Sequence, residues 1–243
     1  MRRPTASWSS SPVPPDRTGA AGVRHRRLSA VKLWTDEVVP RITDKLLGSG
    51  EVMKLRRRAV DSLSGDVVEI GFGSGLNVPL YPSEVTRVYA VDPSLVARRL
   101  SQSRVDASPV DVQFVGLDGA HLPLDDSSVD SALSTFTLCT IPDVTSALSE
   151  VRRVLRPGGT FHFLEHGLCP DPAVAHKQHR FNGLQQRLCG GCHLDRPIDA
   201  LVREAGFEVT ELQHDQMPGP SFMLPWGYLY EGVATRPLEA EAT

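Results

Sequence analysis

Hydrophobic positions near the start of the chain recur every three or four residues, which is the period of an amphipathic helix. The first such series contains Val31, Trp34, Val38, Ile42 and Leu46. Pro40 falls inside the series and is expected to bend the helix, because proline has no backbone N–H to donate. A second helix is predicted from roughly Glu51 to Leu63, with Val52, Leu55 and Ala59 on its apolar face and Arg56–Arg58 mostly off that face.

The period shortens after residue 65, where short runs rich in β-branched and aromatic residues begin. These runs are "DVVEI" (66–70), "TRVYAVD" (86–92), "DVQFVG" (111–116), "SVDSALSTF" (128–136) and "GTFHFLEHG" (159–167). Helical patterns separate them, which is typical of an α/β protein with a doubly wound parallel sheet. His162, within the last run, is expected to be a sheet residue packed under a helix.

The clearest helical pattern lies between the fourth and fifth of these runs. Asp143 is its predicted N-cap, and Pro157-Gly158-Gly159 is predicted to end it. Its apolar stripe consists of Val144, Ala147, Leu148, Val151, Val154 and Leu155.

The last third of the chain predicts one more helix and a pair of strands. "LDRPIDALVREAGFEV" indicates a helix followed by a strand, and "SFMLPWGYLYEGVATR" is aromatic and extended. Their proximity favours a hairpin, so the sheet is expected to end in an antiparallel pair.

Charge is unevenly distributed along the 243 residues. Residues 1–28 contain six arginines and one aspartate, a net charge of about +5, so the remainder carries about −8. The basic segment is rich in Ser, Pro and Gly and has no periodic apolar positions, so we predict a disordered tail. The acidic remainder argues against nucleic acid as a partner, because phosphate contacts need clustered Lys and Arg.

The remaining composition is that of a globular protein, with 40% hydrophobic and 23% charged residues. No run reaches the ~18 apolar residues of a membrane span, and no apolar core follows the twin arginines as in a signal peptide. Four cysteines without a signal peptide predict reduced thiols and a cytoplasmic location. The predicted organisation is a tail (1–28), a helical cap (29–64), one α/β domain (65–236) and a disordered C-terminus (237–243).

Three glycines stand where the first strand run ends. In "EIGFGSGLN" (69–77) they are Gly71, Gly73 and Gly75, placed at the carboxyl edge of the predicted parallel sheet, where such folds bind ligands. Glycine permits a tight turn and close approach of a ligand to the backbone. A plain turn between a strand and a helix is the other interpretation of this pattern alone.

Two carboxylates follow at the ends of the next strand runs. Asp92 lies 21 residues after Gly71, as expected of a carboxylate that binds ribose hydroxyls, and Asp118 could accept a hydrogen bond from an adenine amino group. Each alone also fits a helix cap or turn, but their succession at strand ends favours a nucleoside site.

Leu76 occupies the place of the third glycine in the dinucleotide fingerprint, and no lysine or arginine is evident for a pyrophosphate. A cationic nucleoside without phosphates, S-adenosylmethionine (SAM), suits these residues and the neighbouring Glu69.

The ordered motifs resemble those of class I SAM-dependent methyltransferases with a methyltransferase type 11 domain. They are "VVEIGFGSGLN", "VYAVDPS", "GLDGAHLPLDDSSVD" and "EVRRVLRPGGTFHFLEHG". "LCTIPD", "FLEHG" and "GGCHLDR" are similar to motifs of the branch that includes animal alkyl thiol methyltransferases and their bacterial relatives. The resemblance covers roughly Val31 to Ala234 and implies a Rossmann-like sheet of seven strands, the last antiparallel, with N-terminal helices.

The resemblance also implies roles for individual residues. Asp92 would bind the ribose with Pro93 and Ser94 behind it, and Asp118 and Gly119 would hold adenine. The residues expected around the methionine part and at the end of the fourth strand are Glu69, Gly71, Gly73, Gly75, Asn77 and Thr135. The animal relatives begin with an apolar membrane anchor, whereas this chain begins with an arginine- and proline-rich segment.

The candidate catalytic residue is His166, which follows Glu165 at the carboxyl end of the fifth strand. It is expected to face the acceptor pocket, where it would act as a general base near neutral pH. A histidine hydrogen-bonded to a neighbouring loop is the alternative. A base is needed only if the acceptor arrives protonated, and a thiol needs little help because its pKa is about 8.5.

The expected acceptor pocket comprises Cys139, Glu165, Cys192 and Arg196. Cys139 is also compatible with simple packing. Cys189, Cys192 and His193 have zinc or redox spacing, but a structural zinc site wants four ligands, so no metal is predicted. We interpret "LCGGCHLDR" as a loop covering the pocket, with Arg196 anchored to a carboxylate.

The predicted function is SAM-dependent methyl transfer to a small apolar acceptor, with a thiol favoured by the resemblance. The alternatives are methylation of a quinone, a phenol or a phospholipid amine, a non-catalytic SAM- or adenosine-binding protein, and a nicotinamide-dependent oxidoreductase, which Leu76 disfavours. The oligomeric state is left open.

Overall fold

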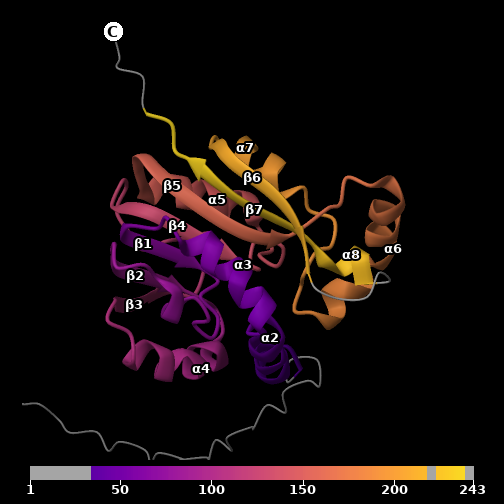
Figure 1. Ribbon diagram of the computed structural model, residues 1–243, viewed down its shortest axis with the longest axis horizontal. Helices are drawn as coiled ribbons and strands as arrows, with labels where there is room; N and C mark the ends of the chain where they lie inside the picture. Colours follow the sequence, from indigo (N-terminus) through magenta and orange to yellow (C-terminus); the bar gives the residue numbers. More distant parts are fainter. Residues whose placement is uncertain (1–33, 218–222, 239–243) are drawn as a thin grey trace, which may run out of the picture.

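A computed structural model describes residues 34–217 and 223–238. A seven-stranded sheet forms its centre, with strand order β3-β2-β1-β4-β5-β7-β6 (Figure 1). The strands are β1 (Gly65–Ile70), β2 (Val85–Val91), β3 (Asp111–Gly116), β4 (Val129–Thr135), β5 (Leu155–His166), β6 (Glu208–Gln216) and β7 (Tyr228–Thr235). Only β7 runs antiparallel to its neighbours β5 and β6. The predicted Rossmann-like class, with its last strand antiparallel, is confirmed.

Helices lie on both faces of the sheet and at its carboxyl edge. The α-helices are α2 (Val39–Leu47), α3 (Gly50–Val60), α4 (Leu95–Asp106), α5 (Val144–Val154), α6 (Pro172–Leu188), α7 (Ile198–Glu204) and α8 (Leu224–Gly227). A π-helix, η1 (Trp34–Val38), precedes α2, and a 3₁₀-helix, η2 (Val78–Leu80), follows β1. None of the described helices is both long and apolar enough to span a bilayer.

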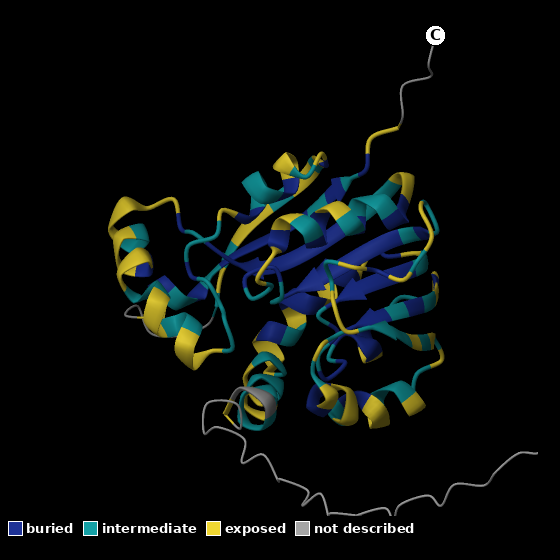
Figure 2. Cartoon of the chain, turned by 180° about the vertical axis from the view of Figure 1, so that it is seen from behind, coloured by how far each residue is buried: buried dark blue, intermediate teal, exposed yellow. Residues whose placement is uncertain are grey.

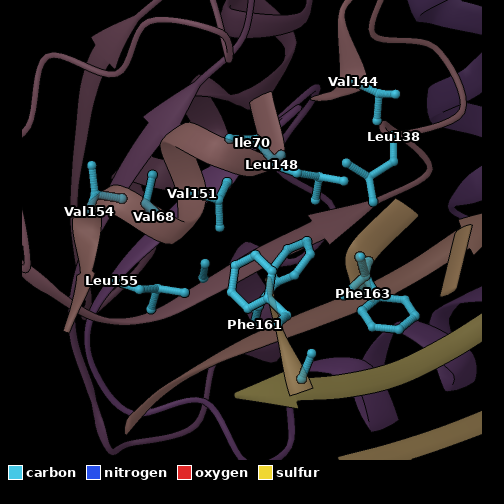
Figure 3. Close-up of a cluster of buried hydrophobic side chains, with 14 of the residues drawn as sticks. Val68, Ile70, Leu138, Val144, Leu148, Val151, Val154, Leu155, Phe161 and Phe163 are labelled. Atoms are coloured by element: carbon cyan, nitrogen blue, oxygen red, sulfur yellow. The ribbon is translucent and has the colours of Figure 1, made fainter. Parts of the chain in front are cut away.

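Two apolar cores form on opposite faces of the sheet. On one face, the apolar stripe of α5 and residues of α7 pack against Val68, Ile70, Phe161 and Phe163 (Figure 3). On the other face, Val67, Val88 and Leu133 pack against Val60 of α3 and Leu63 beyond it. Figure 2 shows the buried sheet between helices whose outer faces are exposed. Since both faces are covered, the central strands consist of nearly continuous apolar residues.

Asp143 caps α5 as predicted, its carboxylate accepting a hydrogen bond from the Ser146 N–H at 3.0 Å. The predicted end of this helix is wrong by one residue at Leu155, which pairs with Val129 as the first residue of β5. Strand β5 therefore includes the Pro157-Gly158-Gly159 segment, where Gly158 adopts a φ of 80°. The glycines allow an irregular strand start instead of a loop.

The predicted first helix is present, but its predicted apolar stripe does not face the core. Pro40 lies at the start of α2, directly after the π-helix. Trp34, Ile42 and Leu46 are exposed, and Val31 lies outside the described residues. The predicted tail 1–28 also lies outside them, as do residues 239–243 of the predicted disordered C-terminus. The division into a cap (29–64) and a single α/β domain (65–236) stays a prediction.

His162 lies under α3, as the sequence indicates. Its Nδ1 is 3.2 Å from the Ala59 carbonyl oxygen and its Nε2 is 3.1 Å from the Thr160 hydroxyl. Because a carbonyl only accepts, Nδ1 carries the proton of the neutral ring. Burial lowers the pKa of His162 to about 4, against the opposing effect of the hydrogen bond to Ala59.

This burial predicts a pH-dependent stability. Unfolded His162 takes up a proton below about pH 6.5, whereas the folded protein does so only near pH 4, so protons favour the unfolded state as the pH falls. Between about pH 7 and pH 4.5, wild type should lose about 2 kcal/mol more unfolding free energy than His162→Gln. Urea unfolding at both pH values measures this. Equal losses in the two proteins would contradict a buried neutral His162.

Candidate active site

A turn of positive-φ glycines follows β1. Gly71, Gly73 and Gly75 have φ values of 72°, 57° and 72°. A Cβ on Gly71 would lie 1.8 Å from the Thr137 hydroxyl oxygen, so no larger residue fits there. The segment after the turn is the single 3₁₀ turn η2 instead of the expected helix, and Pro79 and Pro82 account for this because proline disfavours a helical residue before it.

Asp92 joins the glycine turn to the end of β2. Its carboxylate accepts hydrogen bonds from the N–H groups of Gly73 at 2.8 Å and Ser94 at 2.7 Å. Burial raises the pKa of Asp92, while these two hydrogen bonds lower it. Ser94 in turn caps α4 by accepting from the Ala97 N–H at 3.1 Å.

Asp118 lies beyond the end of β3 and is more open to solvent. Its side chain is 66% exposed and accepts from the Ala120 N–H at 2.9 Å. Gly119 follows it, and a Cβ there would be 3.6 Å from Ile141, in ordinary contact.

The carboxyl edge of the sheet encloses a cavity of about 580 Å³. One part of its wall contains predicted cofactor residues, namely Gly71, Gly73, Asp92, Pro93, Ser94, Asp118, Gly119 and Thr135. The other part is mostly apolar and consists of Val39, Pro40, Leu47, Thr140, Ile141, Pro142, Gly190 and Gly191. The cavity therefore has a polar end between β1, β2 and β3, marked by Asp92 and Asp118 although Phe72 and Leu117 also line it, and a mostly apolar end covered by α2 and two loops.

Helix α2 is attached to the glycine turn by a polar contact. Asp44 accepts a hydrogen bond from the Ser74 hydroxyl at 2.6 Å and forms an ion pair with Arg104 of α4 at 3.0 Å. Arg104 also donates to the Ser74 carbonyl oxygen at 2.7 Å. Across the cavity, a Cβ on Gly190 would lie 3.6 Å from Val39, so α2 and the 190–191 loop meet as a cover.

Arg56 of α3 is buried in the cavity wall, with an exposed fraction of only 4%. It donates to the Asn77 side-chain oxygen at 2.9 Å and to the Thr135 hydroxyl at 2.8 Å. Its guanidinium lies 5.1 Å from the centre of the Phe136 ring. Burial lowers the pKa of Arg56 to about 10, although the charges of Glu69 and Glu165 oppose this shift. Arg56 therefore stays protonated at neutral pH inside the wall.

The interpretation that Arg56 lies off the buried face is wrong. Val52, Arg56 and Val60 are spaced four apart, so all three share one face of α3, and all are buried. That spacing is the signal in the sequence that could have identified Arg56.

Glu69, Gly75 and Asn77 lie outside the cavity lining. Glu69 is buried and accepts from the Asn77 amide at 2.8 Å and from the Tyr81 hydroxyl. Burial raises the pKa of Glu69 to about 7, against the hydrogen bonds from Tyr81 and Asn77. Asn77 thus bonds to both residues: its amide donates to Glu69, and its side-chain oxygen accepts from Arg56.

Glu165 organises the segment after β4. Its carboxylate accepts from the Ser134 hydroxyl at 2.6 Å, the Thr137 N–H at 2.9 Å and the Cys139 N–H at 3.4 Å. Burial raises its pKa, and these hydrogen bonds lower it. Glu165 is fully buried and is not part of the cavity wall.

His166 does not face the cavity as expected. It is buried, and its Nδ1 lies 4.0 Å from the Cys192 sulfur. Within residues 34–217 and 223–238, its Nε2 has no hydrogen-bond partner. Strand β5 is buried on both faces, so alternation along it cannot tell which side chain points toward a cavity.

The 189–193 loop lies beside the 137–141 segment. His193 N–H donates to the Cys139 carbonyl oxygen at 2.8 Å, and Gly190 and Gly191 reach the cavity wall. Cys139 and Cys192 themselves lie outside the lining.

Arg196 donates to the Leu138 and Ile141 carbonyl oxygens, so the expected anchoring to a carboxylate is wrong. Backbone carbonyl oxygens accept hydrogen bonds, so they take the place of the expected carboxylate here.

The chain is similar in sequence to known methyltransferases. A family model described as a methyltransferase domain matches residues 68–163. The thiol S-methyltransferase TMT1B of Mus musculus is 32% identical over 179 residues, covering 71% of this chain and 72% of the relative. A phosphatidylethanolamine N-methyltransferase of Cereibacter sphaeroides is 28% identical, covering 69% of this chain and 83% of the relative.

A solved structure is similar to this chain in fold. A SAM-dependent methyltransferase from Thermotoga maritima superposes with a TM-score of 0.59 at 24% identity, over 84% of this chain and 99% of that one. The extent and identity of the match to the mouse enzyme establish the family. The chain belongs to the class I SAM-dependent methyltransferases.

Proposed function

We propose that this methyltransferase moves the methyl group of SAM to the thiol of a small apolar acceptor bound in the 580 Å³ cavity. The observation that carries the proposal is the division of this cavity into a polar end and an apolar end. The similarity to thiol S-methyltransferases supports a thiol over other acceptors. A cytoplasmic location and the absence of a nucleic-acid partner stay predictions.

The polar end fits the nucleoside part of SAM. We assign the ribose hydroxyls to Asp92, whose position the Gly73 and Ser94 N–H groups fix. We assign the adenine to Asp118 and Gly119, and the methionine part to the glycine turn after β1. Asp92 lines the cavity, and each carboxylate oxygen has capacity to accept a second hydrogen bond, as from a hydroxyl.

We assign the methionine carboxylate to Arg56, which the sequence analysis did not include. Arg56 faces the cavity beside Thr135, and its described hydrogen-bond partners are neutral groups, so its charge is not neutralised by a contacting acid. A buried guanidinium gains most from a carboxylate that it can contact directly.

The chemistry asks little of the protein beyond alignment. SAM supplies a methyl group already activated by the sulfonium. The wall formed by Val39, Leu47 and Ile141 would hold an apolar acceptor and exclude water. The titratable side chains of the described wall are Asp44, Arg56, Asp92 and Asp118. An acceptor that ionises near neutral pH suits such a wall, and a thiol does so with a pKa of about 8.5.

The role of His166 as a general base stays a prediction. Its imidazole contacts Cys192 and does not lie on the cavity wall. A thiol acceptor can react as a self-ionised thiolate, so the proposed reaction does not depend on His166.

A panel of acceptors tests the proposed function. Small alkyl and aryl thiols, a quinol and a dispersed phosphatidylethanolamine are each incubated with isotopically labelled SAM, and products are identified by mass. Thiols should be methylated, at rates that rise with pH until the thiol is fully ionised. Methylation of only the quinol or only the amine would contradict the thiol acceptor and identify the other acceptor class instead. SAM binding without turnover on any acceptor would favour a binding protein.

Replacing Asp92 should weaken SAM binding. Asp92→Ala is expected to cost about 1.5–3 kcal/mol of binding free energy, the scale of hydrogen bonds to a charged acceptor. Calorimetry measures the affinity, and melting temperature checks the fold. Asp125→Ala, at an exposed position outside the wall, is the matched control and should bind normally. Unchanged affinity in Asp92→Ala would remove Asp92 from the ribose role.

Replacing Arg56 should affect only ligands that carry the methionine carboxylate. Arg56→Met is expected to raise the Kd for SAM about 10–100-fold, since a charge-assisted hydrogen bond is lost. Binding of 5′-methylthioadenosine, which lacks the amino acid part, should change little. Arg57→Met alters the exposed neighbour on the same helix and serves as control. Equal losses for both ligands would indicate a structural role alone.

A further inference from the structure

Two cysteines and a histidine converge behind the cavity wall. Cys192 of the 189–193 loop is partly exposed, and its sulfur lies 4.0 Å from the His166 Nδ1. Cys139 is buried next to it, on the segment whose carbonyl accepts from the His193 N–H at 2.8 Å. The proposed methyl transfer uses neither thiol.

The backbone geometry allows the two cysteines to be joined. The hydrogen bond between His193 N and Cys139 O leaves only one backbone atom between each bonded group and the Cα of its cysteine. Disulfides connect residues whose Cα atoms are usually about 4.4–6.8 Å apart, a separation that such neighbouring backbones can reach. All four cysteines are free thiols here.

The surroundings differentiate the two thiols. The neighbouring Cys139 thiol, and after it the His166 imidazole, lower the pKa of Cys192 in spite of burial. The contact with Cys192 and burial raise the pKa of Cys139. One sulfur is therefore suited to attack as a thiolate, and the other stays a protonated thiol beside it.

We propose that Cys192 and Cys139 form a peroxide-sensitive dithiol, in which Cys192 is oxidised first and Cys139 then closes a disulfide. The Cys192 thiolate attacks one oxygen of hydrogen peroxide and breaks the O–O bond. Cys192 becomes a sulfenic acid, and the departing hydroxide takes a proton to form water. The Cys139 sulfur then attacks the sulfenic sulfur, its proton leaves with the hydroxyl as a second water, and the S–S bond forms. Two thiols are oxidised and one peroxide is reduced to two waters.

The consequence would be a covalent bond between two parts of the cavity wall. Gly190 and Gly191, next to Cys192, and Thr140 and Ile141, next to Cys139, all line the apolar end. The disulfide would tie these segments together at the site where, if the proposed function holds, the acceptor binds. Oxidation would then change the affinity for the acceptor more than the affinity for SAM.

Mass spectrometry tests the disulfide without any methyl transfer, so its failure is distinct from failure of the proposed function. The full chain is treated with hydrogen peroxide, remaining thiols are capped with N-ethylmaleimide, and peptides are mapped. The expected product links Cys139 to Cys192, and a phosphine reductant reverses it. A phosphine is required because a thiol reductant could itself be methylated.

Three variants assign the roles of the sulfurs. Cys139→Ser should stop at a Cys192 sulfenic acid that dimedone traps, and Cys192→Ser should lose the fast reaction. Cys189→Ser is the matched control, since Cys189 is the exposed cysteine of the same loop, and it should still form the link. In wild type, Cys192 should react about 10-fold faster than Cys189 at neutral pH.

His166→Gln should slow the oxidation of Cys192, a change that a purely structural role would not produce in a protein with unchanged melting temperature. A Cys189–Cys192 link in wild type would overturn the proposal. So would equal, slow reaction of Cys189 and Cys192.

Discussion

The candidate site depends on one buried positive charge. A guanidinium with an exposed fraction of 4% is tolerated only when its donors are satisfied and acids stand nearby. Asn77, after the glycine turn, and Thr135, at the end of β4, supply the acceptors. Since Arg56 belongs to α3, these contacts fix that helix across the carboxyl edge of the sheet. Arg58, two residues later, fixes the same helix to β7 and β6 through Glu231 and Asp215.

Glu69 and Glu165 are buried acids near Arg56, and burial raises the pKa of each. Burial raises the pKa of Glu69 to about 7, against the hydrogen bonds from Tyr81 and Asn77 and the charge of Arg56. Burial also raises the pKa of Glu165, but backbone N–H groups of the segment after β4 stabilise its charge. The two carboxylates thus differ in their partners: Glu69 accepts from the Asn77 and Tyr81 side chains, and Glu165 holds the backbone that carries Cys139. The segment after β4 therefore connects the proposed cofactor site, through Thr137, to the dithiol, through Cys139.

Much of the fold could be predicted from the sequence because the sheet is buried on both faces. Continuous apolar runs marked the strands, and Asp143 marked the start of α5. Gly71 is a further example, because the contact with Thr137 leaves no space for a side chain. The sequence also predicted that Asp92 and Asp118 lie at one edge of the sheet, where both line the cavity, since strand ends in a parallel sheet meet there.

The missed features depend on contacts between distant segments. Arg56 was placed mostly off the apolar face that Val52, Leu55 and Ala59 define, whereas it is buried with partners 21 and 79 residues away. The partner of Arg196 was predicted as a carboxylate, and the structure has carbonyls. The direction of His166 could not be inferred, because both sides of β5 are covered. Local pattern identifies an element, but tertiary contacts decide which of its polar residues face inward.

The position of β7 between β5 and β6 has a consequence for synthesis of the chain. Strand β6 is made before β7 but pairs only with β7 among the described strands. It must therefore wait, with its ladder of donors and acceptors open to solvent, until β7 has been synthesised. The glycine turn and its neighbouring strands need no such delay, because β1 pairs directly with both β2 and β4. The half of the sheet that carries the proposed nucleoside site can therefore fold first, and β6 and β7 join it together as a later step.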